Sequence, residues 1–206
     1  MKTLRMASCM APNADETCGG IASYLANQLA IDVEMVSDIP WAERERQFDR
    51  GEIHLCWLCG VPYIQKASAL KPHVELLAAP VMRAARYGGH AVYFSDIVFH
   101  AQSTFASFAA LRGARWAYNE PNSHSGYNVV LYHLSRLGEK AGYFRSATES
   151  GAHQQSLAMI LEGTVDASAI DSTVLEAELQ SKPHLAQDIR VIGSLRPSPM
   201  PPWVMH

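Results

Sequence analysis

The residues best suited to chemistry form one short stretch, Ser123-His124-Ser125-Gly126, between a strand-like segment and an amphipathic helical one. A strand–turn–helix junction of this kind leaves backbone N–H groups unpaired at the positive end of a helix dipole. Two serine hydroxyls beside such amides suit a tetrahedral oxyanion, for example phosphate or phosphonate. The same residue types also make an ordinary helix N-cap, so the stretch alone leaves both interpretations open.

The four cysteines, Cys9, Cys18, Cys56 and Cys59, offer a second kind of chemistry. Cys56 and Cys59 form a Cys-x-x-Cys pair, a spacing found in zinc and redox sites. The pair is expected on a strand that runs into its loop, and the spacing of Cys9 and Cys18 does not complete a zinc site. We therefore expect Cys56 in the core and Cys59 lining a ligand cleft. A disulfide from Cys9 to Cys18 or to Cys59 stays open for an exported protein.

Composition narrows the range of partners. A chain of 206 residues that is 48% hydrophobic can build one large domain or two small lobes. A net charge of −3 gives no basic footprint for nucleic acid or an anionic membrane. The nine histidines lack metal-ligand spacing, and no apolar run reaches the roughly 20 residues of a membrane span. Residues 1–6 lack a signal-peptide apolar region, so either a cytoplasmic protein or a mature or recloned form is expected.

Strands and helices alternate along the chain. Strands are expected at residues 3–8, 31–36, 53–58, 74–79, 90–99, 114–117, 165–170 and 189–192, the last before a proline-rich tail at 197–202. Helices are expected from Gly19-Gly20, from Pro40 to Gly51, from Cys59, over 104–111, from Ser125, over 154–162 and from Asp171 to Leu179. Repeated β-turn-α units with apolar strands predict parallel α/β sheets, where ligands gather at the carboxyl ends of the strands.

Three blocks of sequence resemble one known family. Residues 120–127, Glu-Pro-Asn-Ser-His-Ser-Gly-Tyr, resemble the Asp-Pro-x-Ser-Thr-Ser-Gly-Tyr/Phe signature of phosphonate-binding periplasmic proteins. Residues 150–153 and 157–167 are similar to the Ala-Gly-His and Val-Asp-Val-Ala blocks of that family, and residues 51–63 resemble its first-lobe strand and ligand loop. The blocks keep their order and intervals over nearly the whole chain. The sequence therefore resembles the solute-binding proteins of ABC importers for phosphate, phosphite and phosphonates.

The resemblance implies a two-lobed α/β fold of the type II periplasmic-binding class. Each lobe would be a mainly parallel sheet flanked by helices, and the lobes would close on the ligand by a hinge motion. Residues 1–98 with 195–206 would form the first lobe, and residues 99–194 the oxyanion-binding second lobe. Family members continue past the position of His206, so a short member, or a fragment with an incompletely covered first lobe, is expected.

The resemblance also assigns a ligand site. The expected ligand-binding residues are Ser123, His124, Ser125, Gly126, His153, Tyr93, Trp41, Asp171, Cys59 and Tyr63. Several of them have a plainer interpretation: Trp41 and Tyr93 as core aromatics, His153 as a satisfied loop histidine, and Asp171 as a helix N-cap.

Two departures from the family pattern bear on the ligand. His124 stands where the family usually has threonine, and Thr173 stands where aminoethylphosphonate binders carry a glutamate for the ammonium group. A ligand without a cationic end, such as phosphate, phosphite or a small alkylphosphonate, is therefore favoured.

The expected function is binding without catalysis. We expect a monomer without metal or cofactor that delivers its ligand to an ABC membrane permease if it is exported, in the periplasm as the resemblance implies. A cytoplasmic or sensory ligand-binding domain of the same fold is one alternative. A phosphoester-processing enzyme using His153 or Cys59 is another, although the sequence lacks a Walker lysine, a nucleophile elbow and a metal cluster.

Overall fold

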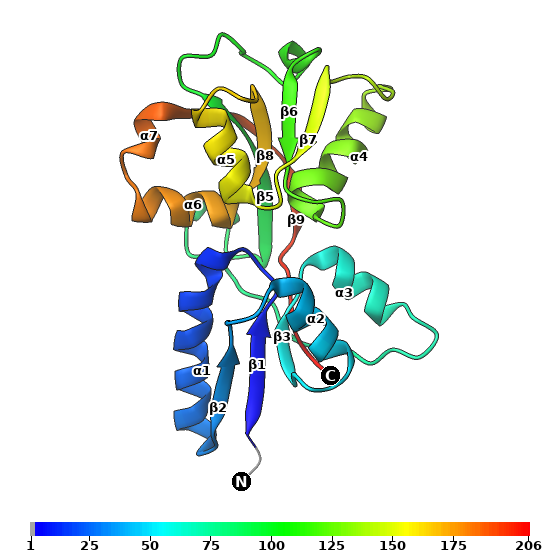
Figure 1. Cartoon of the computed structure of the whole chain (residues 1–206), viewed down its shortest axis with the longest axis vertical. Coiled ribbons are helices and arrows are strands. Elements are labelled where there is room, and N and C mark those ends of the chain that lie inside the picture. Colours follow the sequence, from blue (N-terminus) through cyan, green and yellow to red (C-terminus); the bar gives the residue numbers. More distant parts are fainter. Residues whose placement is uncertain (1–2) are drawn as a thin grey trace. The chain divides into compact units, whose positions relative to one another are not determined.

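The computed structural model describes residues 3–206, which divide into two compact α/β units (Figure 1). Unit 1 comprises the described residues up to Ala91 together with Pro199–His206, and unit 2 comprises Val92–Ser198. Each unit is built on its own five-stranded sheet. The chain thus leaves unit 1 once, builds all of unit 2, and returns for its last residues.

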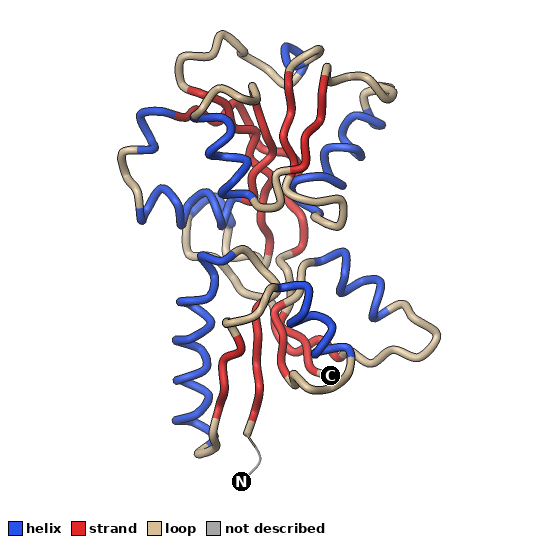
Figure 2. Tube along the Cα trace, viewed as in Figure 1, coloured by secondary structure: helices blue, strands red, loops and turns tan. Residues whose placement is uncertain are grey.

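The sheet of unit 1 has the strand order β2-β1-β3-β10-β4. Figure 2 shows strands in red and helices in blue. Its strands are β1 (Leu4–Ser8), β2 (Val33–Val36), β3 (Leu55–Trp57), β4 (Glu75–Ala78) and β10 (Trp203–Met205). Its helices are α1 (Asp15–Leu29), α2 (Trp41–Asp49) and α3 (Gly60–Ala67), with short turns η1 (Pro12–Ala14) and η2 (Ala85–Tyr87). Strand β1 is parallel to β2 and β3, whereas β10 is antiparallel to β3 and β4.

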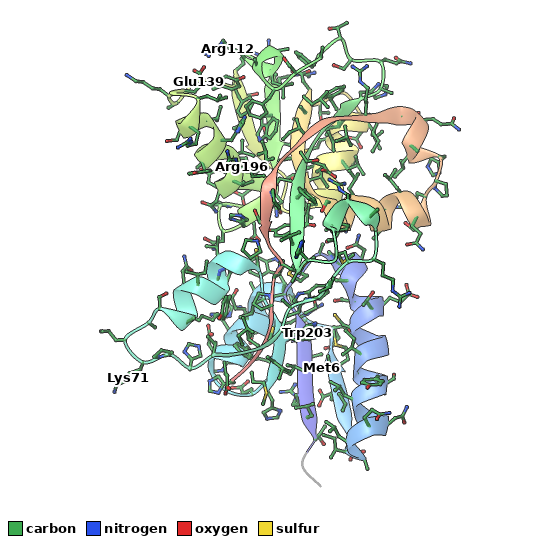
Figure 3. All side chains as sticks on the ribbon, turned by 180° about the vertical axis from the view of Figure 1, so that it is seen from behind. Met6, Lys71, Arg112, Glu139, Arg196 and Trp203 are labelled. Carbon is green, nitrogen blue, oxygen red and sulfur yellow. The ribbon has the colours of Figure 1, made fainter. Side chains whose placement is uncertain are left out.

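Alternating side chains give this sheet a hydrophobic core on each face. Met6 and Trp203, both labelled in Figure 3, pack on the face covered by α1. Their neighbours Ala7 and Val204 point the other way and pack with Phe48 of α2. Because successive residues of a strand face opposite sides, helices on both faces require the nearly continuous apolar strands seen in the sequence.

The sheet of unit 2 has the strand order β7-β6-β8-β5-β9. Its strands are β5 (Val92–His100), β6 (Arg115–Tyr118), β7 (Ser146–Glu149), β8 (Ala167–Asp171) and β9 (Ile189–Pro199). Its helices are α4 (Val129–Arg136), α5 (His153–Leu161), α6 (Ser172–Ser181) and α7 (Leu185–Asp188), with short turns η3 (Ala109–Leu111) and η4 (His124–Asn128). Strand β6 is parallel to β7 and β8, and β5 is antiparallel to β8.

Two cores also enclose the sheet of unit 2. On one face Trp116 stacks on Phe144 with ring centroids 4.5 Å apart, in a cluster that includes Val130 of α4. On the other face Ala117 packs with Leu157 of α5 and with residues of α6. Because β6 and β8 are adjacent parallel strands, their carboxyl ends lie at the same edge of the sheet. Strand β6 leads into η4, and β8 leads into α6.

The structure confirms much of the expected element order. Every strand expected from the sequence overlaps an observed strand. Parallel pairing is confirmed for β1 with β2 and β3 and for β6 with β7 and β8, but β5 and β10 make both sheets mixed. The strand expected at 189–192 extends to Pro199, and a further strand, β10, forms directly after the proline-rich tail. Proline fits here because β9 lies at the edge of its sheet, where an N–H donor is dispensable.

Three helix predictions need correction. Helix α1 begins at Asp15 rather than at Gly19, so Cys18 lies inside a helix and not in a loop. The helix expected over 104–111 is wrong, because only Ala109–Leu111 forms a short turn. Hydroxyls of the serines in this segment accept hydrogen bonds from nearby backbone N–H groups, which competes with helix formation. The helix expected from Ser125 becomes α-helical only at Val129.

Two further observations concern residues 3–206. Within this range no helix combines the length and apolar character that crossing a bilayer requires. In the same range no three His, Cys, Asp or Glu side chains are grouped so that they could hold a metal ion.

Candidate functional site

The turn after β6 is shaped by one π-helical turn, η4. Ser123 is its N-cap, and the N–H of Asn128 donates to the Ser123 carbonyl at 3.0 Å, five residues back. The side-chain amide of Asn128 donates to the same carbonyl at 2.9 Å. This wide first turn then continues into α4 at Val129. Single π-turns of this kind occur frequently at functional sites.

The backbone amides of this turn divide into used and open donors. The Ser123 N–H donates to the Glu120 carbonyl at 3.1 Å, and the Gly126 N–H donates to Ser123 Oγ at 3.2 Å. The N–H groups of His124 and Ser125 lie in the first turn, where a helix supplies no acceptor, and no backbone acceptor for them exists in the part of the chain that the structure describes. Two amides and the proton of the Ser123 hydroxyl therefore remain to donate to a ligand.

His153, the first residue of α5, lies beside this turn. Its Nε2 is 3.1 Å from Ser125 Oγ, and both side chains are buried. Burial lowers the pKa of His153 to about 4, so the ring is neutral at pH 7. Its Nδ1 and the Oδ1 of Asn119 are buried without a partner among residues 3–206. Buried polar atoms of this kind are uncommon and costly, which marks the surroundings of the turn as a site rather than packing.

His124 points to a different partner, Ser198. The Nε2 of His124 lies 2.8 Å from Ser198 Oγ, near the end of β9, and the rings of His124 and Tyr93 have centroids 6.4 Å apart. Burial lowers the pKa of His124, so this ring is also neutral at pH 7. Ser198 was not predicted from the sequence, because a single serine between prolines carries no pattern that indicates a long-range contact.

Gly126 is the tightest point of the turn. A Cβ at this position would lie 2.0 Å from Asn119 Oδ1 and 3.1 Å from a ring carbon of His153. The absence of a side chain at residue 126 therefore lets the turn pack against both residues. The sequence signature placed a glycine here, and the structure gives its physical reason.

Asp171 caps helix α6. Its Oδ1 accepts from the Thr173 N–H at 2.8 Å and from the Thr173 hydroxyl at 2.7 Å. Burial raises the pKa of the Asp171 carboxyl to about 6, although the hydrogen bonds from Thr173 act in the opposite direction. The N-cap interpretation of Asp171 is confirmed, and a ligand contact by this residue stays a prediction.

The predicted site residues fall into two groups. Unit 2 brings Ser123, His124, Ser125, Gly126, His153 and Tyr93 together around η4, and it also contains Asp171. Trp41, Cys59 and Tyr63 belong to unit 1. Trp41 begins α2 with 37% of its surface exposed, Cys59 is the N-cap of α3, and Tyr63 packs against the core of unit 1.

These features define a class of protein. Two α/β units with mixed sheets, joined where the chain leaves unit 1 and where it returns, form the two-lobed fold of type II periplasmic binding proteins. The chain belongs to the family of periplasmic substrate-binding proteins of phosphonate ABC transporters, whose family model matches residues 10–206. This family consists of binding proteins and not of enzymes, as the sequence predicted.

Known relatives are distant in sequence. The chain is 22% identical over 169 residues to the probable ABC transporter phosphite binding protein PhnD1 of Prochlorococcus marinus (strain MIT 9301). The match covers 81% of this chain and 56% of that protein, so this chain spans little more than half the length of the curated relative.

Solved structures share the fold. PhnD1 of the same organism in complex with methylphosphonate has a TM-score of 0.81 and 21% identity, covering 99% of this chain and 76% of that one. A binding protein component of an ABC phosphonate transporter from Pseudomonas aeruginosa has a TM-score of 0.81 and 16% identity, covering 98% and 68%. The aliphatic sulphonate binding protein of Escherichia coli has a TM-score of 0.68 and 17% identity, covering 100% and 61%.

Replacing Gly126 by alanine should distort the turn. The added Cβ would overlap Asn119 Oδ1, so Gly126→Ala is expected to destabilise the protein by about 1–3 kcal/mol, measured by urea unfolding. Gly20→Ala is the matched control. Gly20 is exposed within α1 with open space at its Cβ position, so this variant should be as stable as the wild type or more stable. Equal stability of the two variants would contradict the tight contact at residue 126.

Two buried groups should change the stability of the protein in opposite directions as the pH falls. The folded-state pKa of His153 is about 4 against an ordinary 6.5, so its contribution to stability falls by about 3 kcal/mol as the pH drops through this range. The folded-state pKa of Asp171 is about 6 against 3.8, so its contribution rises by about 3 kcal/mol as the pH drops through that range.

The variants His153→Gln and Asp171→Asn separate the two contributions. Relative to the wild type, the free energy of unfolding of His153→Gln should increase on acidification from about pH 6.5 to about pH 4, and that of Asp171→Asn should decrease. Urea unfolding across this pH range measures both slopes, and a lower baseline stability of either variant does not affect the comparison. Parallel pH profiles for all three proteins would refute this assignment.

Proposed function

We propose that this chain is the solute-binding component of an ABC importer and binds one small phosphorus oxyanion: phosphate, phosphite or a simple alkylphosphonate. The observation that carries the proposal is the first turn of η4, where the open N–H groups of His124 and Ser125 stand beside the hydroxyls of Ser123 and Ser125. Donors grouped at a helix start suit the oxygens of a tetrahedral anion. Membership of the phosphonate-transporter family supports this ligand class.

The proposed donors are neutral, so geometry rather than charge would select the ligand. Burial lowers the pKa values of both His124 and His153, which keeps the two rings uncharged at pH 7. A set of amides, hydroxyls and imidazole N–H groups recognises an anion by the number and direction of its oxygens. Phosphite, alkylphosphonate and phosphate differ in one group on phosphorus, which is P–H, P–C or P–OH. The site would distinguish the three ligands where this group meets the fewest hydrogen-bond donors.

His124 would replace a hydroxyl donor of the family pattern by an imidazole. In our proposal the Ser198 hydroxyl donates to Nε2 of His124, which places the ring proton on Nδ1. The ring would then present one directed N–H to the ligand. Ser198 acts here as a positioning residue, because it fixes the tautomer of His124 rather than touching the anion.

The absence of a cationic end on the ligand follows from Thr173 and Asp171. Thr173 stands where the resemblance expects a glutamate in aminoethylphosphonate binders, and its hydroxyl is engaged by Asp171. The carboxyl of Asp171 is itself buried and occupied as the cap of α6. In our proposal the ligand therefore carries an uncharged substituent rather than an ammonium group, because the Asp171 carboxylate is already engaged by Thr173.

The remaining parts of the proposal concern the whole transport system. We propose that a first lobe of residues 1–98 and 195–206 closes by a hinge motion over the second lobe, residues 99–194, and contributes Trp41, Cys59 and Tyr63 to the ligand. The protein would act as a monomer in the periplasm and deliver its ligand to a membrane permease. The family description, a periplasmic substrate-binding protein of an ABC transporter, supports the proposed location and the delivery to a permease.

Calorimetric titration with phosphate, phosphite, methylphosphonate and aminoethylphosphonate tests the ligand class. We expect binding of at least one of the first three, and aminoethylphosphonate should bind at least about tenfold more weakly than methylphosphonate, or about 1.4 kcal/mol. Sulfate serves as the tetrahedral control without phosphorus. Failure of all phosphorus oxyanions to bind, or tightest binding of aminoethylphosphonate, would overturn the proposal.

Removing the two hydroxyls of the turn tests the site. The double variant Ser123→Ala/Ser125→Ala should lose about 2–4 kcal/mol of affinity for the ligand found by calorimetry, because two oxygens of a buried anion lose their partners. The control Ser135→Ala/Ser146→Ala removes two exposed hydroxyls elsewhere in unit 2 and should bind like the wild type. Thermal unfolding checks that both proteins are folded. Unchanged affinity in the first variant would exclude the turn as the site.

A further inference from the structure

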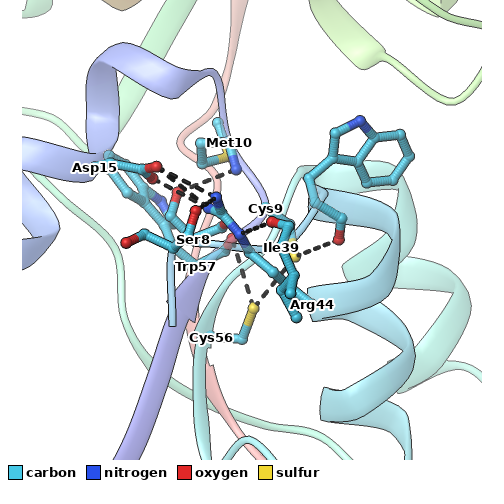
Figure 4. A network of polar contacts seen from close by, with 10 residues as sticks. Ser8, Cys9, Met10, Asp15, Ile39, Arg44, Cys56 and Trp57 are labelled. Atoms are coloured by element: carbon cyan, nitrogen blue, oxygen red, sulfur yellow. Dashed lines mark hydrogen bonds and ion pairs between the residues drawn. The ribbon is translucent and has the colours of Figure 1, made fainter. Parts of the chain in front are cut away.

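Two thiols meet in unit 1, far along the sequence from η4. The Sγ atoms of Cys9 and Cys56 lie 3.5 Å apart, as the close view in Figure 4 shows. Cys9 directly follows β1, and Cys56 lies in the adjacent parallel strand β3, where it pairs with Ala7. The Cys9 N–H donates to the Trp57 carbonyl at 2.9 Å. The sheet itself therefore holds the two thiols against each other.

A buried guanidinium fixes the loop that carries Cys9. Arg44 of α2 donates to the Ser8 carbonyl at 2.8 Å and to the Ile39 carbonyl at 2.8 Å, and it pairs with Asp15 at 3.2 Å (Figure 4). These contacts tie the segment after β1 to the segment before α2. Two groups held in this way react with a high effective concentration, because little freedom is lost when a bond forms between them.

The other two cysteines are placed differently. Sequence analysis left open a bridge from Cys9 to Cys18 or to Cys59, but the thiol in contact with Cys9 is that of Cys56. Cys18 is buried on the opposite face of the sheet, in the core with Met6, and burial raises its pKa to about 11. None of the four cysteines, all within the described residues, is in a disulfide in this structure.

We propose that Cys9 and Cys56 form a dithiol–disulfide couple that a small disulfide, such as glutathione disulfide, can oxidise by exchange. Cys9 is half-buried, whereas Cys56 is fully buried, so Cys9 is the more accessible of the two residues. The Cys9 thiolate, after losing its proton to water, attacks one sulfur of the small disulfide and expels one thiolate, which leaves a mixed disulfide on Cys9. Cys56 then loses its proton, attacks Cys9 Sγ and expels the second thiolate. One protein disulfide forms, and two electrons reduce the small disulfide to two thiols.

The order of the two steps follows from the surroundings of each sulfur. The neighbouring Cys9 and burial raise the pKa of the Cys56 thiol well above its ordinary value, so Cys56 is a poor first nucleophile. It becomes effective once Cys9 carries a leaving group at contact distance.

Oxidation of the pair would change a hydrogen bond at the start of α2. The Cys9 thiol donates to the carbonyl of Trp41, the first residue of α2, at 3.6 Å. A bridge removes this proton, so the carbonyl loses one donor. The bridge also joins β1 to β3 covalently and restricts the unfolded chain, which should raise the temperature of unfolding. The couple would thus connect the redox state of unit 1 to the segment that carries Trp41.

The test uses the full chain with the variant Cys18→Ser/Cys59→Ser, which retains only the proposed pair. Incubation with glutathione disulfide should remove both remaining thiols together, as measured by thiol titration after denaturation. Tryptic digestion should then yield a linked pair of peptides, residues 6–44 and residues 51–66, that dithiothreitol separates. The Tm of the oxidised protein should be several degrees higher than that of the reduced protein.

The single variant Cys9→Ser is the matched control, and it should keep Cys56 as an unmodified thiol under the same conditions. The wild type, digested and fragmented within the linked peptides, gives the same answer if the double variant does not fold. A bridge from Cys9 to Cys18 or Cys59, a lasting glutathione adduct on Cys9, or complete retention of thiols would each overturn the proposal.

Discussion

The candidate site depends on two backbone N–H groups that the helix they begin cannot satisfy. The amides of His124 and Ser125 lie in the first turn after β6, where no preceding carbonyl is in reach. Ser123 closes the turn by accepting from Gly126, and the π-turn extends the closure to Asn128. Every other feature of the site either keeps these two donors in place or adds a donor beside them.

The site has donors but no cation among its own side chains, and burial is the reason. His124 and His153 both belong to the candidate site, and desolvation disfavours the charged form of each ring. His153 Nδ1 has no partner among the described residues although it is buried, which costs stability. Under the proposed function, the site would offer directed hydrogen bonds to an anion without the strong attraction for any anion that a lysine or arginine would exert.

The sequence could predict what depends on local pattern and could not predict what depends on distant contacts. Apolar strands and the Ser-His-Ser-Gly turn were visible because periodicity and turn chemistry act within a few residues. The contact from Ser198 to His124, by contrast, joins positions separated by most of unit 2. The strand β10 was missed because it follows two prolines and pairs with strands far earlier in the chain. The pairing of Cys9 with Cys56 depends on strand order, which no local pattern fixes.

The loop around Arg44 in unit 1 and the turn after β6 in unit 2 differ in how their polar groups are satisfied. In unit 1 the buried guanidinium of Arg44 supplies hydrogen bonds to loop carbonyls, and Asp15 balances its charge, so the loop polar groups around it are satisfied internally. In unit 2 the turn after β6 leaves the N–H donors of His124 and Ser125 open. A loop whose polar groups are already hydrogen-bonded can contact a ligand through apolar surface, such as the exposed ring of Trp41, but it can offer few hydrogen bonds. Open amides offer hydrogen bonds but need a ligand to satisfy them. Under the proposed function, the turn after β6 would therefore supply most of the hydrogen bonds to the anion, and substitutions in unit 1 would change which anion fits more than whether an anion binds.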